Sequence, residues 1–300
     1  MEDEPGQVYG IFPLMKIFLL VVFGIFGVLI LGLYLGQAQF IYFPRSYSTY
    51  TKMLSSVDQV RYDLDDQMQV AFLLKRESNA PPKEIWWFFG GNGSLALNWV
   101  PLVEKVVPDR PDTVFVLVDY PGYGYCRGRP NPERIQRAFD DLYAKLSDRW
   151  GLSAEEMSQR SSAMGHSLGA AVALDSANRY DFGRVVAISP FTTMKAMARK
   201  QLGGFFELLL SHHYNNETSI DGLLAKSERP EIILFHGDRD PMIPIQMGLS
   251  LAARANKDGQ IAFSRVPGAT HNNIIAAIED ELSTILKGGE PHSPEKKTKD

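Results

Sequence analysis

Met164-Gly165-His166-Ser167-Leu168-Gly169 is the stretch on which the fold of this 300-residue sequence depends. Its glycines stand two residues before and two residues after a serine, the G-x-S-x-G pattern typical of a nucleophile elbow. Residues 161–163 favour a strand and residues 170–174 a helix, so the serine would lie in a sharp strand-to-helix turn. Glycines are needed beside it because a Cβ there would clash with neighbouring backbone. The alternative is an ordinary turn serine, so the partners of Ser167 must decide.

The composition is that of an ordinary globular protein, with 45% hydrophobic and 22% charged residues. A net charge of −4 gives no reason to expect a nucleic-acid partner. The single cysteine, Cys126, cannot form an intramolecular disulfide, and no His or Cys spacing typical of zinc is present. The glycines of residues 122–128 lack the dinucleotide-binding spacing, so we interpret them as a turn. We therefore expect no metal and no cofactor.

Ile17 to Gly36 forms a run of 20 residues without a charge. At about 1.5 Å per residue a helix of this length spans about 30 Å, the hydrocarbon thickness of a bilayer. A cleaved signal peptide is the alternative, because Gly36-Gln37-Ala38 has the small-x-small form of a cleavage site. The run exceeds the usual signal length, however, and residues 1–4 include acidic rather than basic side chains. We predict an uncleaved single-pass anchor that binds the lipid bilayer through residues 17–36.

Positive charges determine the membrane orientation only weakly. Lys16 lies before the anchor, and Arg45 and Lys52 lie after it. The usual arrangement of a signal anchor places the N-terminus in the cytoplasm and the following domain on the extracytoplasmic side, which we favour slightly.

Strand-like and helical runs alternate after the anchor. The predicted strands are 60–64, 69–75, 84–89, 113–118, 161–163, 184–188, 231–235 and 260–266. The predicted helices are 95–107, 132–150, 170–174, 194–211, 245–256 and 273–287. The first two strands would form a hairpin, and the rest predict an α/β fold with a mostly parallel sheet and helices on both faces. Ligands of such sheets bind at the carboxyl ends of the strands.

The domain prediction follows from this pattern. We divide the chain into a polar segment (1–16), a transmembrane helix (17–36), a linker (37–56), an α/β domain (57–287) with a short lid at about 191–230, and a disordered tail (288–300).

Ser167, Asp240 and His271 follow predicted strands in the chain order nucleophile, acid, base, which is the α/β-hydrolase order. Residues 57–287 resemble the α/β-hydrolase superfamily, and most closely its membrane-anchored Bem46-like and serine aminopeptidase S33-type members. The quoted likenesses are Phe89-Gly90-Gly91-Asn92-Gly93 to the family's oxyanion loop, Asp119-Tyr120-Pro121-Gly122-Tyr123-Gly124 to its Asp-Tyr-Arg-Gly-Tyr-Gly turn, residues 236–244 to its acid motif and residues 268–273 to its histidine motif. Gly90 replaces the histidine that supports the loop in the family, so we expect the loop to lack that support.

The resemblance implies a role for each motif residue. Ser167 would be the nucleophile, His271 the base and Asp240 the acid that orients it, with Asp238 as a less favoured acid. The backbone N–H groups of Leu168 and of Asn92, with Gly91 as its neighbour, would bind the oxyanion.

Two histidines and one asparagine outside the predicted triad also stand out in the sequence. We interpret His236 as a support for the acid loop and His166 as packing support in the elbow. Asn216 opens an N-glycosylation sequon, which has meaning only in a secretory eukaryotic host.

The predicted function is that of a membrane-anchored serine hydrolase acting on a carboxylic ester or thioester, with a small-molecule or lipid-like acyl substrate. Residues 202–210 are apolar and suit either an acyl pocket or a position near lipid. An amidase or aminopeptidase remains an alternative, as does a non-catalytic membrane-tethered scaffold. The sequence leaves the oligomeric state open.

Overall fold

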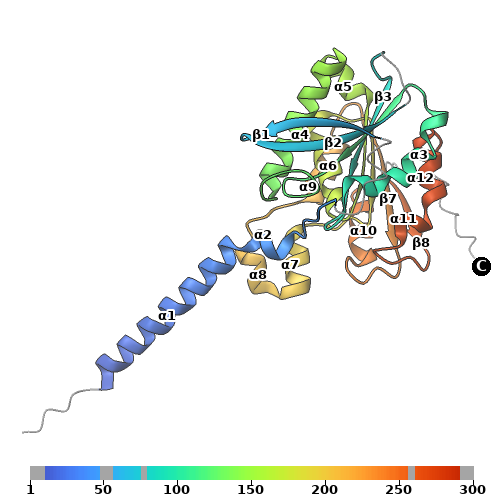
Figure 1. Cartoon of the computed structure of the whole chain (residues 1–300). Coiled ribbons are helices and arrows are strands. Elements are labelled where there is room, and N and C mark those ends of the chain that lie inside the picture. The colour runs from blue at the N-terminus through green and yellow to red at the C-terminus, as the bar shows by residue number, and fades with distance from the viewer. Residues whose placement is uncertain (1–10, 48–56, 76–79, 256–260, 291–300) are drawn as a thin grey trace, which may run out of the picture.

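A single eight-stranded sheet forms the centre of the domain in the computed structural model, which describes residues 11–47, 57–75, 80–255 and 261–290 (Figure 1). The strands are β1 (Asp58–Leu64), β2 (Gln67–Leu74), β3 (Glu84–Phe89), β4 (Thr113–Val118), β5 (Ser161–His166), β6 (Arg184–Ile188), β7 (Glu231–Gly237) and β8 (Ile261–Val266). Their order is β1-β2-β4-β3-β5-β6-β7-β8. Only the β1–β2 and β2–β4 pairs are antiparallel, so the predicted mostly parallel sheet is confirmed.

The predicted hairpin is also confirmed, and its turn has a local cause. Asp65 and Asp66 both have positive φ, 50° and 57°, as a two-residue turn with the right twist requires. Asp tolerates this conformation better than most residues because its short side chain hydrogen-bonds locally. The turn therefore sets the register in which Leu64 pairs with Gln67.

The central strands are buried on both faces, which explains why they read as continuous apolar runs. From Ile85 to Phe89 every side chain of β3 is fully buried. Trp87 packs edge-on against Phe139 of α4 (Pro132–Trp150), with ring centroids 5.0 Å apart. The aromatic β3 is thus the middle of the core, and its carboxyl end lies at the candidate site.

Helices cover both faces of the sheet, with α4, α5, α6 and α9 on one side and α3 and α12 on the other (Figure 1). The helices are α1 (Ile11–Leu35), α2 (Gln37–Ile41), α3 (Val100–Glu104), α4 (Pro132–Trp150), α5 (Ala154–Arg160), α6 (Leu168–Tyr180), α7 (Met194–Leu202), α8 (Gly204–Leu209), α9 (Asn216–Leu224), α10 (Ile245–Ala252), α11 (Ile274–Ala277) and α12 (Glu279–Leu286), with 3₁₀ turns η2 (Ala96–Trp99) and η3 (Val107–Asp109).

Three predicted helices are wrong as continuous elements. The helix expected over 273–287 is divided into α11 and α12 at Ile278. The helix expected over 95–107 is divided into η2, α3 and η3, because Pro101 and Pro108 cannot donate helical hydrogen bonds. The helix expected over 194–211 is divided into α7 and α8 at Gly203, whose φ is 94°.

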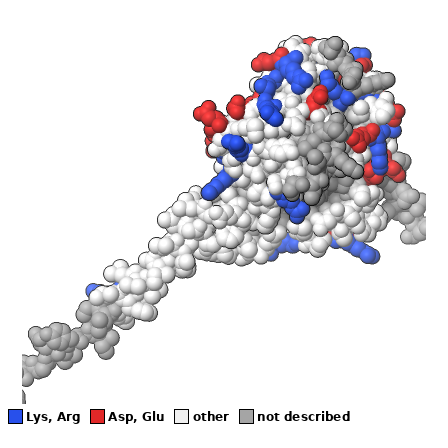
Figure 2. All heavy atoms as spheres, viewed as in Figure 1, with Lys and Arg blue, Asp and Glu red and all other residues white. Residues whose placement is uncertain are grey.

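The N-terminal helix α1 projects from the domain as a stalk that shows almost no charge (Figures 1 and 2). Within the described residues, Met15–Leu35 is the one helix that by length and composition could cross a membrane, and none of it is buried in the protein. The following residues are not a free linker. Helix α2 comes directly after Gly36, and Tyr42 and Tyr47 are buried against the domain. Residues 48–56 and the end of the predicted tail, 291–300, lie outside the described residues.

Candidate active site

Ser167 occupies the turn between β5 and α6 and has a φ of 56° and a ψ of −115°, a conformation that L-residues rarely adopt. A Cβ on Gly165 would overlap the backbone of Gly169, and a Cβ on Gly169 would overlap the carbonyl of Phe89. The close approach of β5, α6 and β3 therefore requires both glycines. This strand–turn–helix geometry is the one expected from the G-x-S-x-G pattern.

Asp240 and His271 lie after β7 and β8, at the same sheet edge as Ser167. His271 Nδ1 is 2.7 Å from Asp240 Oδ2, and both side chains are buried. Asp240 Oδ1 also accepts hydrogen bonds from the backbone N–H groups of Met242 (2.9 Å) and Ile243 (2.8 Å). Burial acts to raise the pKa of Asp240. The hydrogen bond with His271 and the two backbone hydrogen bonds outweigh this effect and hold the pKa of Asp240 below its usual value. The carboxylate is thus ionised and fixed against the imidazole.

The other acid considered from the sequence, Asp238, has different partners. Its carboxylate pairs with Arg265 at 3.0 Å and accepts a hydrogen bond from the Gly268 N–H at 2.7 Å. Asp238 therefore holds the loop that carries His271 but does not contact the imidazole.

Two further buried histidines support the loops around the site. His166 Nε2 donates to the carbonyl oxygen of His271 at 3.1 Å, and its ring lies 4.7 Å from the His271 ring. His236 Nε2 donates to the carbonyl oxygen of Ile243 at 2.9 Å, which closes the acid loop. Burial lowers the pKa of both, to about 3 for His166, so both are neutral.

The candidate oxyanion loop follows β3 and touches the elbow. A Cβ on Gly91 would lie 2.9 Å from His166 Nδ1 and 3.5 Å from Ser167 Cβ, so the loop backbone passes directly beside the serine. Leu168 is the first residue of α6, and its N–H has no carbonyl in the preceding turn of the helix to bind. Leu168, Asn92, Ser167 and His271 line one pocket.

The loop is supported, contrary to the expectation based on Gly90. Tyr120 donates a hydrogen bond to the Gly90 carbonyl at 2.7 Å, and Tyr123 donates to Asn92 Oδ1 at 2.8 Å. Both tyrosines belong to the Asp-Tyr-x-Gly-Tyr-Gly turn after β4, the neighbour of β3. The two tyrosine hydroxyls thus provide the support that the sequence comparison assigned to a histidine.

The Asn92 side chain also binds residues 37–47, which follow α1 and which we call the anchor segment. Its Nδ2 donates to the Ile41 carbonyl, and its Oδ1 accepts from the Phe43 N–H at 2.9 Å. The sequence contained no signal for this contact, because it joins residues about 50 positions apart through one side-chain amide. The anchor segment is therefore part of the wall of the site.

Asp119, the first residue of the same turn, is buried and accepts hydrogen bonds from the Tyr47 hydroxyl and from the Ala96 N–H, the latter at 2.8 Å. Burial raises its pKa to about 7. Asp119 thus holds Tyr47, in the segment after α1, and the start of η2 against the end of β4.

The pocket above Ser167 has a volume of about 240 Å³ and is mostly apolar. Its lining residues come from the anchor segment, the oxyanion loop, the elbow, the lid and the acid and base loops: Phe40, Ile41, Phe43, Asn92, Ser167, Leu168, Phe191, Met194, Met197, Ala198, Gln201, Leu202, Leu210, Met242, Ile243 and His271. An acyl chain suits such a lining better than a charged group does.

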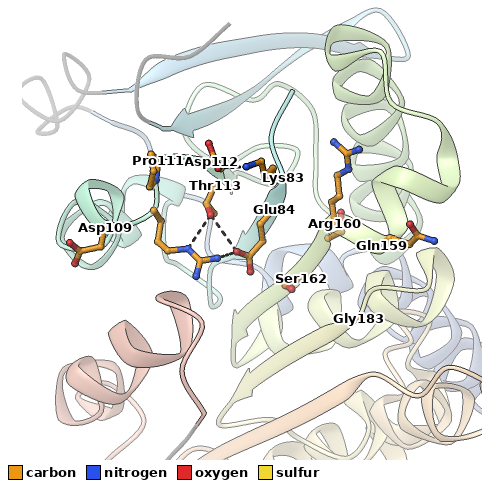
Figure 3. A pocket seen from close by; sticks show the side chains of 12 residues that line it. Lys83, Glu84, Asp109, Pro111, Asp112, Thr113, Gln159, Arg160, Ser162 and Gly183 are labelled. Atoms are coloured by element: carbon orange, nitrogen blue, oxygen red, sulfur yellow. Dashed lines mark hydrogen bonds and ion pairs between the residues drawn. The ribbon is translucent and has the colours of Figure 1, made fainter. Parts of the chain in front are cut away.

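A larger cavity of about 530 Å³ lies at the opposite edge of the sheet, at the amino ends of β3–β6 (Figure 3). Each of its charged side chains has an ion-pair partner. Arg110 pairs with Glu84, whose carboxylate also accepts from Thr113 at 3.3 Å, and Lys83 pairs with Asp112. Arg160 and Asp109 pair with residues outside the lining, Glu156 and Lys287. Its lining contains no histidine to activate a nucleophile. The larger cavity therefore lacks the groups found at the candidate active site, which lies at the other edge of the sheet.

The sequon at Asn216 does not mark an accessible site. The Asn216 side chain is buried and donates to the Phe191 carbonyl at 2.7 Å, so an oligosaccharide has no room in the folded chain. In the lid, His212 Nδ1 lies 3.2 Å from the Tyr42 hydroxyl and contacts the anchor segment.

The strand order, the elbow and the acid–histidine pair define a class of protein, and comparison with known proteins gives the same class. A model of the alpha/beta hydrolase family matches residues 88–225. The Pyrococcus furiosus esterase Pf2001 superposes with a TM-score of 0.61 at 17% identity, over 82% of this chain and 96% of the esterase. Est1E from Butyrivibrio proteoclasticus superposes with a TM-score of 0.57 at 12% identity, over 77% of this chain and 96% of Est1E. The chain therefore has the α/β-hydrolase fold, and residues 88–225 are similar to the alpha/beta hydrolase family.

Among curated proteins, this chain is similar to alpha/beta hydrolase domain-containing protein 17B of Xenopus laevis, with 27% identity over 156 residues that make up 52% of this chain and 49% of that protein. The human protein 17C is 28% identical over 156 residues, 52% of this chain and 43% of that protein. The match thus spans half or less of the length of these relatives.

Proposed function

We propose that the chain is a membrane-anchored serine hydrolase that cleaves a carboxylic ester or thioester. The observation that carries the proposal is the 2.7 Å contact between Asp240 Oδ2 and His271 Nδ1, beside a pocket that Ser167 and His271 line together. The anchor would be the apolar helix that includes Met15–Leu35.

In this mechanism His271 takes the proton of the Ser167 hydroxyl through Nε2 while the serine oxygen bonds to the acyl carbon. Asp240 keeps the proton on Nδ1 and stabilises the imidazolium. The N–H groups of Leu168 and of Asn92 or Gly91 receive the oxyanion, and removal of one such donor typically costs about 3 kcal/mol of barrier. His271 then protonates the leaving alcohol or thiol, and water attacks the acyl-enzyme in the same way.

The pocket favours an acyl substrate over the aminopeptidase alternative. An aminopeptidase has to bind the substrate's free ammonium group, for which a carboxylate is the usual partner. In the described part of the chain, no aspartate or glutamate lines the pocket that contains Ser167. Phe40, Leu202 and Leu210 line it instead and suit a hydrocarbon chain.

A fluorophosphonate probe on the detergent-solubilised full chain tests the nucleophile. We expect covalent labelling of the parent protein, and loss of labelling together with at least a thousandfold lower esterase rate for Ser167→Ala. Ser189→Ala is the matched control, because Ser189 also follows a strand with positive φ, 47°, and is buried. Equal labelling of folded Ser167→Ala would support the non-catalytic scaffold or a different nucleophile.

Substrate class is tested with p-nitrophenyl esters of increasing chain length against aminoacyl p-nitroanilides. We expect kcat/KM for the octanoyl ester to exceed that for alanyl anilide at least a hundredfold. The reverse order would favour the amidase or aminopeptidase alternative.

A further inference from the structure

The lid carries an exposed apolar surface beside the pocket. None of the side chains of α8 is buried, and Leu208 is 84% exposed. Leu202 and Phe205 are also exposed, at the end of α7 and in α8. Phe40 of α2, 66% exposed, belongs to the same side, because Phe40 and Leu202 line one pocket. We refer to Phe40, Leu202, Phe205 and Leu208 as the lid patch.

The lid patch is fastened to the end of α1. The Gln37 amide donates to the Leu209 carbonyl at 2.6 Å, and its oxygen accepts from the Ser211 N–H at 2.8 Å and from the Ser211 hydroxyl at 3.2 Å. Gln37 itself is buried by these contacts. Figure 1 shows α7 and α8 directly beside α2, where the stalk of α1 meets the domain. The lid is therefore held at a fixed position relative to the anchor.

The length of the apolar helix determines where the lid lies relative to the membrane. Met15–Leu35 contains 21 residues, which extend about 31 Å and match the hydrocarbon thickness of a bilayer without slack. If this helix spans the membrane, Leu35 reaches the edge of the hydrocarbon and Gln37 lies in the headgroup region. Leu209, bound to Gln37, lies there as well, and α8 cannot lie far above the surface.

The charges of the lid suit a phospholipid surface. The helix α7 carries Lys195, Arg199 and Lys200, and the one acidic residue of α8, Glu207, pairs with Arg199 at 2.5 Å. Cationic and apolar side chains on neighbouring short helices are typical of segments that lie in the membrane interface.

We propose that the lid patch inserts into the bilayer surface and that the pocket opens to the lipid, so that the substrate is a membrane-resident acyl ester or thioester whose chain enters from the leaflet. This inference rests on the proposed hydrolase function for its substrate and on α1 for its geometry. In this proposal, the lid patch contacts the lipids of the bilayer. An acyl chain that passes between Phe40 and Leu202 towards Ser167 stays in apolar surroundings throughout and avoids the cost of exposure to water.

Insertion is tested without reference to activity. The full chain with Leu208→Cys is labelled with bimane and reconstituted into vesicles of phosphatidylcholine with about one-fifth phosphatidylglycerol. Lys83→Cys, exposed at the opposite edge of the sheet, is the matched control, and the unsubstituted chain, whose Cys126 is buried, gives the background. We expect doxyl-labelled lipids to quench position 208 at least twofold and position 83 not at all. Equal quenching at the two positions would overturn the proposal.

Substrate entry is tested with the double variant Phe205→Asp, Leu208→Asp. We expect hydrolysis of dissolved p-nitrophenyl butyrate to stay within twofold of the parent, and hydrolysis of a long-chain ester embedded in the vesicles to fall at least tenfold. The control Ala144→Asp, Gln159→Asp adds the same charge at exposed positions of α4 and α5 and should change neither rate. Equal rates for the parent and the lid variant on embedded ester would contradict entry from lipid. A parent that hydrolyses neither ester, with position 208 still quenched, would instead reject the hydrolase function and leave the membrane contact standing.

Discussion

At the scale of single residues, Asn92 joins the anchor segment to the loop proposed to bind the oxyanion. Its amide contacts Ile41, Phe43 and Tyr123 at once. The candidate hydrogen-bond donor to the oxyanion is the backbone N–H of Asn92. The side chain of Asn92 would therefore contribute only by holding the loop in place.

We predict that Asn92→Ala lowers kcat about tenfold while KM changes less than twofold, because the donor remains but is less well placed. Tyr123→Phe removes one of the three contacts and should give a smaller loss. Steady-state kinetics with a short soluble ester provide the measurement. An unchanged kcat for Asn92→Ala would show that the loop keeps its position without the side chain.

His166 and Asp119 make opposite contributions to the pH dependence of stability. The pKa of His166 is depressed to about 3, so its contribution is complete above the unfolded value near 6.5 and is lost as the pH falls towards 3. The pKa of Asp119 is raised to about 7, so its contribution is complete below about pH 4 and is lost as the pH rises through 7.

Single variants should therefore separate the two effects. From pH 7 to pH 5, the parent loses about 2 kcal/mol of unfolding free energy through His166 and gains about 2 kcal/mol through Asp119. Relative to the parent, His166→Asn should become more stable over that interval and Asp119→Asn less stable. Urea unfolding at the two pH values gives the comparison, and the same pH slope in all three proteins would contradict both assignments.

At the scale of elements, the contact between β5, α6 and β3 depends on Gly165 and Gly169, where a Cβ has no room. We predict that either change to alanine costs at least about 3 kcal/mol of stability or prevents folding, because the obstacle is backbone and not a movable side chain. Gly183→Ala is the matched control, since a Cβ there meets nothing within 4 Å. Thermal unfolding distinguishes these variants, and a stable Gly165→Ala protein would refute the packing described for the elbow.

The elements also show what sequence patterns can and cannot predict. The apolar runs of β3 and β4 and the turn residues of β1–β2 were sufficient to locate those strands. The motifs at the carboxyl ends of the strands were sufficient to predict that His271 lies beside Asp240, because adjacent parallel strands end at one sheet edge. The breaks in the helices around Pro101 and at Gly203 were missed because the apolar pattern continues across them. The Asn92 and Gln37 contacts were missed because side-chain hydrogen bonds between distant segments leave no periodic signal.

At the scale of the whole molecule, the segment between α1 and the domain contributes to both stability and the site. We predict that a chain starting at Gly36 keeps its thermal stability and its activity on soluble esters. A chain starting at Arg45 loses the burial of Tyr42, worth about 2–3 kcal/mol, together with the Gln37 and Asn92 contacts.

The second truncation should unfold at least about 5 °C lower and lose most of its esterase activity. Calorimetry and ester hydrolysis of the two shortened chains, compared side by side, provide the measurement. Equal unfolding temperatures would mean that residues 37–44 do not contribute to the stability of the domain.

If α1 spans a membrane and the chain is the hydrolase proposed above, the hydrogen bonds of Gln37 to the lid also have a kinetic consequence. A hydrolase held at a fixed height and angle by its anchor meets substrate by lateral diffusion within one leaflet and does not have to be recaptured from solution. The effective concentration of a co-resident acyl compound is then set by its surface density, which reaches the millimolar range even for a minor lipid. Such an enzyme gains little from tight ground-state binding, and its selectivity is set by which molecules share its membrane.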